Sequence, residues 1–273
     1  MTAPEAGTPL ALVSGALRRH ERALLAGGSP WAGFAATYRR TTEAVDRALG
    51  TDLFEDPAWV AEWDAAFALF YLDALGGIRS GGPVSRPWRL ALGAPAELPA
   101  LRHVLLGMNA HINYDLPQAL LAVIPAAEFA DPALLAARRR DHERIDEILL
   151  SRVAAEDAAL GGARSLLDRL LVPANRAATG RFLREARRKV WHNTRELHTA
   201  RVNGASVYAA RLAELEALAA ARVQDLLAPG PVVLRLAVHG FGVQLPPGRP
   251  GRPGDARGRP ATRTSWASTP LPL

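Results

Sequence analysis

The chain has 273 residues, of which 49% are hydrophobic, and a formal net charge of +6. This length and composition permit a substantial core, and the absence of cysteine excludes disulfides and thiolate chemistry. Residues 249–263 hold five arginines against a single aspartate, so the positive charge is local, and no aromatic residues interleave with basic ones as in nucleic-acid modules. We therefore expect no specific nucleic-acid partner.

Ala, Leu and Arg dominate the composition, which favours helix over strand. Helix start and stop signals recur, such as Asp56-Pro57 before a periodic apolar stretch and Asn203-Gly204 after another. The pattern predicts an all-α fold, a single multi-helix bundle of seven or eight main helices. Their expected positions are residues 10–25, 30–50, 57–76, 101–124, 132–160, 175–201 and 205–227.

The connection over residues 77–97 is long for a compact domain. It contains Gly81-Gly82-Pro83 and one short predicted helix. Loops of this kind are either lids and binding loops or passive surface loops, and the sequence leaves both alternatives open.

The composition changes to Pro, Gly and Arg from Pro229 onward. We predict a helical domain over residues 1–228 and a tail over residues 229–273 that is disordered from about residue 246, because such a segment buries too little apolar surface to offset its ordering entropy. Within it, residues 232–238 are the one stretch that resembles a strand. No signal peptide or charge-free membrane span is evident, so a cytoplasmic protein is expected.

Residues 107–120 concentrate polar side chains in a segment that otherwise has the apolar periodicity of a buried helix. Helical spacing places His111 and Asp115 one turn apart on one face, and Asn109 and Asn113 one turn apart on a roughly opposite face. Pro117 removes a backbone donor and should free a carbonyl group near the polar side chains. The stretch therefore predicts two polar pairs that point in two directions.

His111 and Asp115 can hold a divalent metal ion together, or the carboxylate can orient the imidazole for acid–base catalysis. The catalytic hypothesis uses His111 as ligand or general base, Asp115 as co-ligand or orienting group and Asp141 as a second carboxylate, with Asn109 and Asn113 binding the substrate. One divalent metal ion, zinc or similar, would be held by His111 and Asp115. The structural alternative is that these buried groups simply satisfy each other.

Two further histidines are followed by an acidic residue four positions later, namely His142 by Asp146 and His192 by Glu196. Helical bundles build metal centres from such inward-facing pairs, but the same spacing also forms ordinary surface ion pairs. Both interpretations stay open.

The run Asn-Ala-His-Ile-Asn-Tyr-Asp-Leu-Pro within residues 107–120 resembles the signature of an actinobacterial family of uncharacterised helical proteins, classed as a domain of unknown function. The resemblance covers about residues 10–228 and implies no established activity. It departs from the family pattern at Asp146, where Asn is expected. The other residues that carry the resemblance are Phe54, Asp56, Pro57, Trp59, Phe67, Tyr71, Asp141, Ile145 and Trp191.

A looser similarity is to the helical fold of zinc-dependent phospholipase C and single-strand nucleases, which carries a His, an Asp four residues later, and then Gln and Pro. Here Pro117 precedes Gln118, and the second His of that pattern is absent. The similarity therefore implies one metal ion at most.

Two functions follow from these patterns. The first is a metal-dependent, hydrolase-like enzyme that acts on a small molecule or lipid. The second is a non-catalytic helical protein that binds a ligand or a partner, with the polar motif as a structural network.

Overall fold

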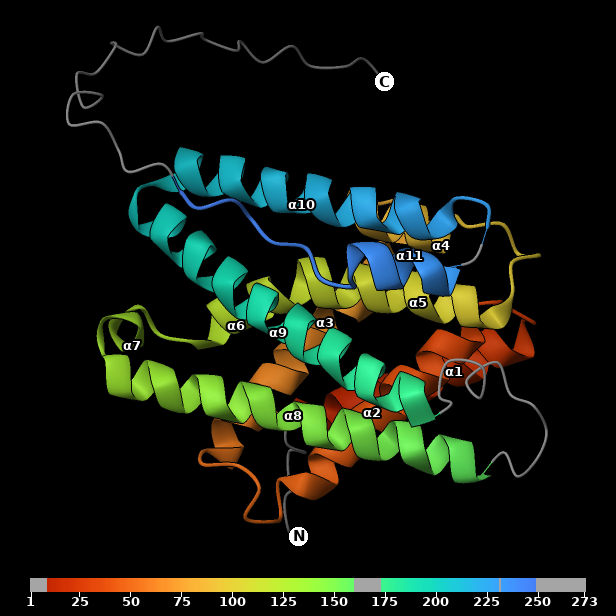
Figure 1. Ribbon diagram of the computed structural model, residues 1–273, viewed down its shortest axis with the longest axis horizontal. Coiled ribbons are helices and arrows are strands. Elements are labelled where there is room, and N and C mark those ends of the chain that lie inside the picture. The colour runs from red at the N-terminus through yellow and green to blue at the C-terminus, as the bar shows by residue number, and fades with distance from the viewer. Residues whose placement is uncertain (1–8, 160–172, 231, 249–273) are drawn as a thin grey trace, which may run out of the picture.

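A computed structural model describes residues 9–159, 173–230 and 232–248 of the chain, with side chains described outside residues 150–183, 233–234 and 237. The described part is built from helices and contains no strand, which confirms the predicted all-α fold (Figure 1). None of the described helices is long and apolar enough to cross a membrane.

The first three helices pack on one another and supply much of the aromatic core. They are α1 (Pro9–Ala26), α2 (Ala32–Ala48) and α3 (Pro57–Ser80). Asp56 caps α3 as expected, accepting a hydrogen bond from the Trp59 backbone at 3.0 Å. The tryptophans and tyrosine of α3 are buried, as their helical spacing predicts.

Helix α3 continues past Gly76-Gly77, where the sequence predicts its end. A Cβ atom on Gly77 would lie 2.6 Å from Val84 Cγ2 and 2.9 Å from the Pro83 carbonyl oxygen. Gly77 therefore lets the following loop pack on the helix. The helix ends instead at Gly81, whose φ of 69° suits glycine.

The central layer is nearly one continuous helix with a wider turn in its middle. It runs through α5 (Ala100–Ala110), the π-helix η1 (His111–Asp115) and α6 (Leu116–Val123). The short helices α4 (Arg86–Leu92) and α7 (Ala126–Ala130) flank it in the sequence. Helix α3 packs on η1 and α6, which places the polar motif in the interior.

The remaining helices cover the other sides of this layer. Helix α8 (Pro132–Ala159) packs on α2, and α9 (Pro173–Val202) packs on α6, α8 and η1. Helix α10 (Ala205–Leu227) lies along α4, α5 and α9.

The chain beyond residue 228 differs from the sequence prediction. Residues 232–238 are not a strand but belong to helix α11 (Val232–His239), and an extended segment over residues 240–248 follows it along α9 and α10 (Figure 1). Leu236 and Leu245 of this part are buried. The packed part of the chain thus extends to residue 248, past the boundary predicted at 228, while residues 249–273 of the predicted tail lie outside the described residues.

Candidate functional site

The polar motif sits on a π-helical turn between α5 and α6. The Leu116 backbone N–H donates to the His111 carbonyl, which is the i to i+5 bond of a π-helix. Pro117 follows in the first turn of α6, where its missing N–H interrupts the regular ladder. Gln118 Nε2 donates to the Tyr114 carbonyl oxygen at 2.8 Å. A π-turn of this kind redirects side chains and occurs frequently at functional sites.

His111, Asp115 and Trp88 form a buried hydrogen-bonded triad. Asp115 Oδ2 lies 2.8 Å from His111 Nδ1 and accepts a hydrogen bond of 2.7 Å from Trp88 Nε1. The predicted pairing of His111 with Asp115 is therefore present, and Trp88 joins it, which nothing in the sequence pattern indicated. Burial raises the pKa of Asp115, which the bonds from His111 and Trp88 oppose.

The imidazole of His111 lies in a cage of aromatic rings. Phe67 stacks on it with ring centroids 3.6 Å apart, and Tyr38 meets it edge-on at 4.7 Å. Close packing of α5 is possible because a Cβ atom on Gly107 would lie 2.7 Å from Phe34 Cδ2. Burial lowers the pKa of His111 despite the nearby carboxylate. The other rings of the cage are Phe34, Tyr71 and Trp88.

One nitrogen of this imidazole has no hydrogen-bond partner among the described residues. This atom, His111 Nε2, is buried and unpaired there, as is the hydroxyl group of Tyr71 in the same cage. With Nδ1 directed at Asp115, Nε2 is the atom that could accept a proton or bind a metal ion.

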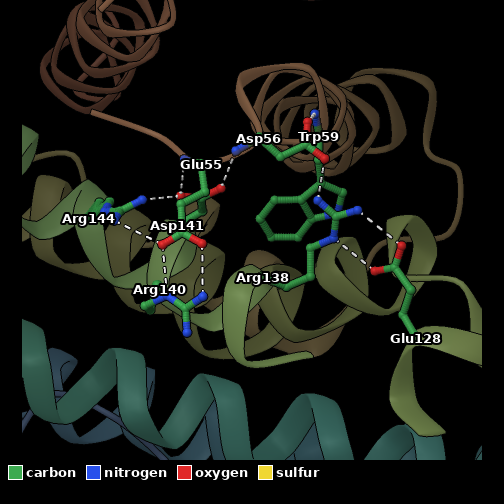
Figure 2. Close-up of polar contacts among 8 residues, drawn as sticks. All are labelled: Glu55, Asp56, Trp59, Glu128, Arg138, Arg140, Asp141 and Arg144. Carbon is green, nitrogen blue, oxygen red and sulfur yellow. Dashed lines mark hydrogen bonds and ion pairs between the residues drawn. The ribbon is translucent and has the colours of Figure 1, made fainter. Parts of the chain in front are cut away.

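Asp141 has a different set of partners from those of the triad. Its two carboxylate oxygens accept hydrogen bonds of 2.8 Å from the backbone N–H groups of Glu55 and Asp56, and one also contacts Arg144 at 2.8 Å (Figure 2). The carboxylate thereby fixes the turn that leads into α3. Beside it, Arg138 bridges Asp56 and Glu128 and lies over the Trp59 ring (Figure 2).

The three histidines that are followed by an acidic residue four positions later do not form one common site with those residues. His142 is fully buried, and both its ring nitrogens are unpaired within the part of the chain that the structure describes, whereas Asp146 pairs with Arg187. His192 Nε2 donates to the Leu245 carbonyl. Among the described residues, no group of three or more His, Cys, Asp or Glu side chains could hold a metal ion.

The opposite face of the π-turn binds the extended C-terminal segment. Asn109 Nδ2 and Asn113 Nδ2 both donate to the Phe241 carbonyl oxygen at 3.1 Å. Asn113 Oδ1 in turn accepts from the Val243 backbone N–H at 3.1 Å. The two asparagines thus point away from the triad, as their spacing predicts, and they bind main chain.

Helix α9 supplies a second asparagine with the same role. Asn193 Nδ2 donates to the Val243 carbonyl at 3.0 Å, and its Oδ1 accepts from the Leu245 N–H at 2.8 Å. Sequence reasoning missed Asn193, although the pattern offered a signal. It shares a helix face with Val190 and Leu197, both fully buried, and a buried asparagine in a helix must find partners outside that helix.

Further contacts extend this main-chain binding along the segment. Lys189 Nζ donates to the Gly242 carbonyl at 3.1 Å, and Arg211 donates to the Pro246 carbonyl. Glu196 Oε2 accepts from the Gly248 N–H at 2.9 Å. We call the groove formed by Asn109, Asn113, Lys189, His192 and Asn193 the asparagine groove.

Fold and site together define an all-helical protein with two distinct polar centres, a buried His–Asp–Trp triad and an asparagine groove that holds an extended segment. The chain matches DUF5995, a family of unknown function, over residues 10–229 and belongs to that family, which confirms the predicted membership of such a family. No curated protein matches the chain, and no solved structure matches it either.

Proposed function

We propose that this protein binds extended polypeptide segments in the asparagine groove, as a non-catalytic interaction protein. The observation that carries the proposal is the double hydrogen bonding of Asn113 and Asn193 to the main chain of residues 241–245. A side-chain amide offers both donor and acceptor groups, so it can bond the N–H and C=O groups of a peptide as a neighbouring β-strand would. Main-chain recognition gives affinity that tolerates changes in the bound sequence.

The position of the groove in the chain supports this function. Every residue of the asparagine groove lies within residues 10–229, the part shared with the family, whereas the bound segment lies beyond it. The groove therefore lies in the part of this chain that the family model matches, and the segment over residues 240–248, which occupies the groove, lies outside that part. A peptide of another protein would take its place.

The test uses the full-length chain with the groove opened by Val243→Asp and Leu245→Asp, which place charges at two buried positions of the segment. A labelled peptide of residues 239–248 is titrated against it by fluorescence anisotropy. We expect saturable binding at one site, and much weaker binding to the wild-type chain, whose tethered segment competes at an effective concentration of about 1 mM or more.

Two controls make the result specific. Adding Asn193→Asp to the opened chain should abolish binding, while Gln118→Ala, which removes an amide bonded only within its own helix, should preserve it. In the peptide, N-methylation at Val243 should weaken binding and N-methylation at Gln244 should not, because the Val243 N–H is bonded and Gln244 is exposed. No saturable binding by an opened chain that still unfolds cooperatively would contradict the proposal. If the double variant does not fold, Val243→Asp alone serves the same purpose.

The second candidate is an enzyme that uses His111 as a general base or metal ligand for a small molecule or lipid. The unpaired, buried Nε2 of His111 is the observation that favours it. Elemental mass spectrometry of the untagged protein, compared with His111→Ala and Asp115→Ala, tests the version with zinc or a similar metal. Near-stoichiometric metal that is lost in both folded variants would support it, and wild-type protein without metal would contradict it. The cytoplasmic location likewise stays a prediction.

A further inference from the structure

The segment in the asparagine groove alternates apolar residues in a way that suits a strand. Phe241, Val243 and Leu245 are buried, whereas Gln244 is exposed. Gly242, between the first two apolar positions, is also buried. Side chains at alternate positions of an extended chain point the same way, so the three apolar side chains are directed into the protein while the main chain is bonded by the groove.

Gly242 lies against the backbone of α9. A Cβ atom at this position would lie 2.8 Å from Ala186 Cα and 3.0 Å from Lys189 Cδ. The lysine chain could move, but Ala186 is a fully buried residue inside a long helix, so its Cα atom cannot. The φ of Gly242 is not in the left-handed region, so what this position requires is space and not an unusual backbone conformation.

Gly240 is required for a different reason. Its φ is 71°, a conformation that residues with a side chain rarely adopt, and a Cβ atom there would meet the Glu185 carboxylate at 2.9 Å. This glycine makes the turn from α11 into the segment. A peptide that arrives from another chain does not need this turn, so the Gly240 constraint belongs to the tethered segment and the Gly242 constraint to the groove.

Val243 and Leu245 enter a small apolar cluster of the domain. Their partners are Leu121 of α6, Leu197 of α9 and Leu215 of α10, all buried. Leu245 is fully enclosed. This cluster is separate from the main core, to which Phe241 belongs, so the groove has apolar contacts for three alternate side chains.

We infer that the asparagine groove selects extended peptides of the pattern apolar, glycine, apolar, any residue, apolar, with the glycine demanded by contact with the Ala186 backbone. This inference rests on the proposed peptide-binding function. It names the partner by chemistry, as an extended segment with three alternate apolar side chains and a glycine between the first two.

The experiment titrates the opened full-length chain with four peptides of residues 239–248, namely the parent sequence, Gly242→Ala, Gln244→Ala and Leu245→Ala. Overpacking a closed contact should weaken binding of the Gly242→Ala peptide by roughly tenfold or more. Loss of an enclosed leucine should have an effect of at least the same order, and Gln244→Ala should bind within about twofold of the parent, because exposed positions contribute little.

The outcomes separate the two proposals. Binding of the parent and of Gly242→Ala with equal affinity would overturn the selectivity and leave peptide binding intact. Failure of the parent peptide to bind would overturn peptide binding itself.

A measurement in the intact chain tests the glycine contact without any peptide. Full-length Gly242→Ala should raise amide hydrogen exchange at Val243 and Leu245 by roughly tenfold or more, while full-length Gln244→Ala should leave it unchanged. Unchanged protection in full-length Gly242→Ala would overturn the inference.

Discussion

Trp88 Nε1 donates a hydrogen bond of 2.7 Å to Asp115 Oδ2, and the two residues are 27 positions apart in the sequence. The bond ties the short helix α4 to the π-turn, and the same oxygen also contacts His111. Because all three side chains are almost fully buried, each group depends on the others for its hydrogen bonds. The stability of the protein and the ionisation of its buried groups therefore depend on these bonds and on the other buried polar groups.

Trp88→Phe should lower the free energy of unfolding by more than Trp63→Phe does. Both substitutions remove the same part of a buried indole, but Trp63 Nε1 has no hydrogen-bond partner, whereas Trp88 Nε1 bonds Asp115. The difference between the variants should be about 1–3 kcal/mol, the cost of leaving a buried acceptor without its donor. Urea denaturation of both variants measures it, and equal losses would show that the Trp88 bond contributes nothing.

His111 should be neutral at pH 8, with its proton on Nδ1. Burial lowers the pKa of this imidazole, and the Nδ1–H tautomer is the one that can donate to Asp115. Nitrogen-15 NMR of labelled protein distinguishes the two tautomers and the protonated form. The Asp115→Asn variant provides the control, since it removes the carboxylate that selects this tautomer. A proton on Nε2 in the wild-type protein at pH 8 would contradict the assignment.

Asp64→Asn should stabilise the protein at pH 8 and leave its stability nearly unchanged at pH 4. Burial, and secondarily repulsion by Asp46, raise the pKa of Asp64 to about 7 from 3.8. At a pH between these two pKa values, the carboxyl group is ionised in the unfolded chain but protonated in the folded chain. It therefore destabilises the fold increasingly as the pH rises toward 7, and by a constant amount at higher pH.

The gain for Asp64→Asn at pH 8 should be up to about 4 kcal/mol, at about 1.4 kcal/mol per pKa unit. Chemical denaturation of wild type and variant at the two pH values provides the measurement. An equal difference between them at both pH values would show that the effect is not the ionisation of Asp64.

Asp141→Ala should destabilise the fold by about 1–3 kcal/mol, because it leaves the partly buried N–H groups of Glu55 and Asp56 without an acceptor. Glu143→Ala on the same helix removes only an exposed pair with Arg139 and should cost less than about 0.5 kcal/mol. Thermal and urea unfolding compare the two. A stable Asp141→Ala variant would remove the structural role and reopen a catalytic one.

Amide hydrogen exchange should alternate along the bound segment. The N–H groups of Val243 and Leu245 donate to Asn113 and Asn193, and Gln244 between them is exposed. We expect slow exchange at Val243 and Leu245 and fast exchange at Gln244. In the Asn193→Ala variant, which removes the oxygen that accepts the Leu245 N–H, protection should fall at Leu245 first. Uniformly fast exchange over residues 241–245 would mean that the groove does not hold the segment.

The sequence by itself determined the helical fold and the two faces of the polar motif. Helix start signals and apolar periodicity depend only on residues that are close together in the sequence. Asp56 and Pro57 therefore mark the start of a helix whatever that helix packs against. The spacing of His111 and Asp115 likewise required them to share a face, and that of Asn109 and Asn113 placed these two on another.

Only the tertiary structure decided which residues contact each face of the polar motif. Periodicity identifies a buried face but not its neighbours, so the sequence could not pair Trp88 with Asp115, or separate Asp141 from His111. The same limit applies to the segment over residues 240–248. Its glycines resemble those of a disordered tail, yet Gly242 permits close approach to α9, and Asn113 and Asn193 supply the hydrogen bonds that offset the ordering entropy of an isolated strand.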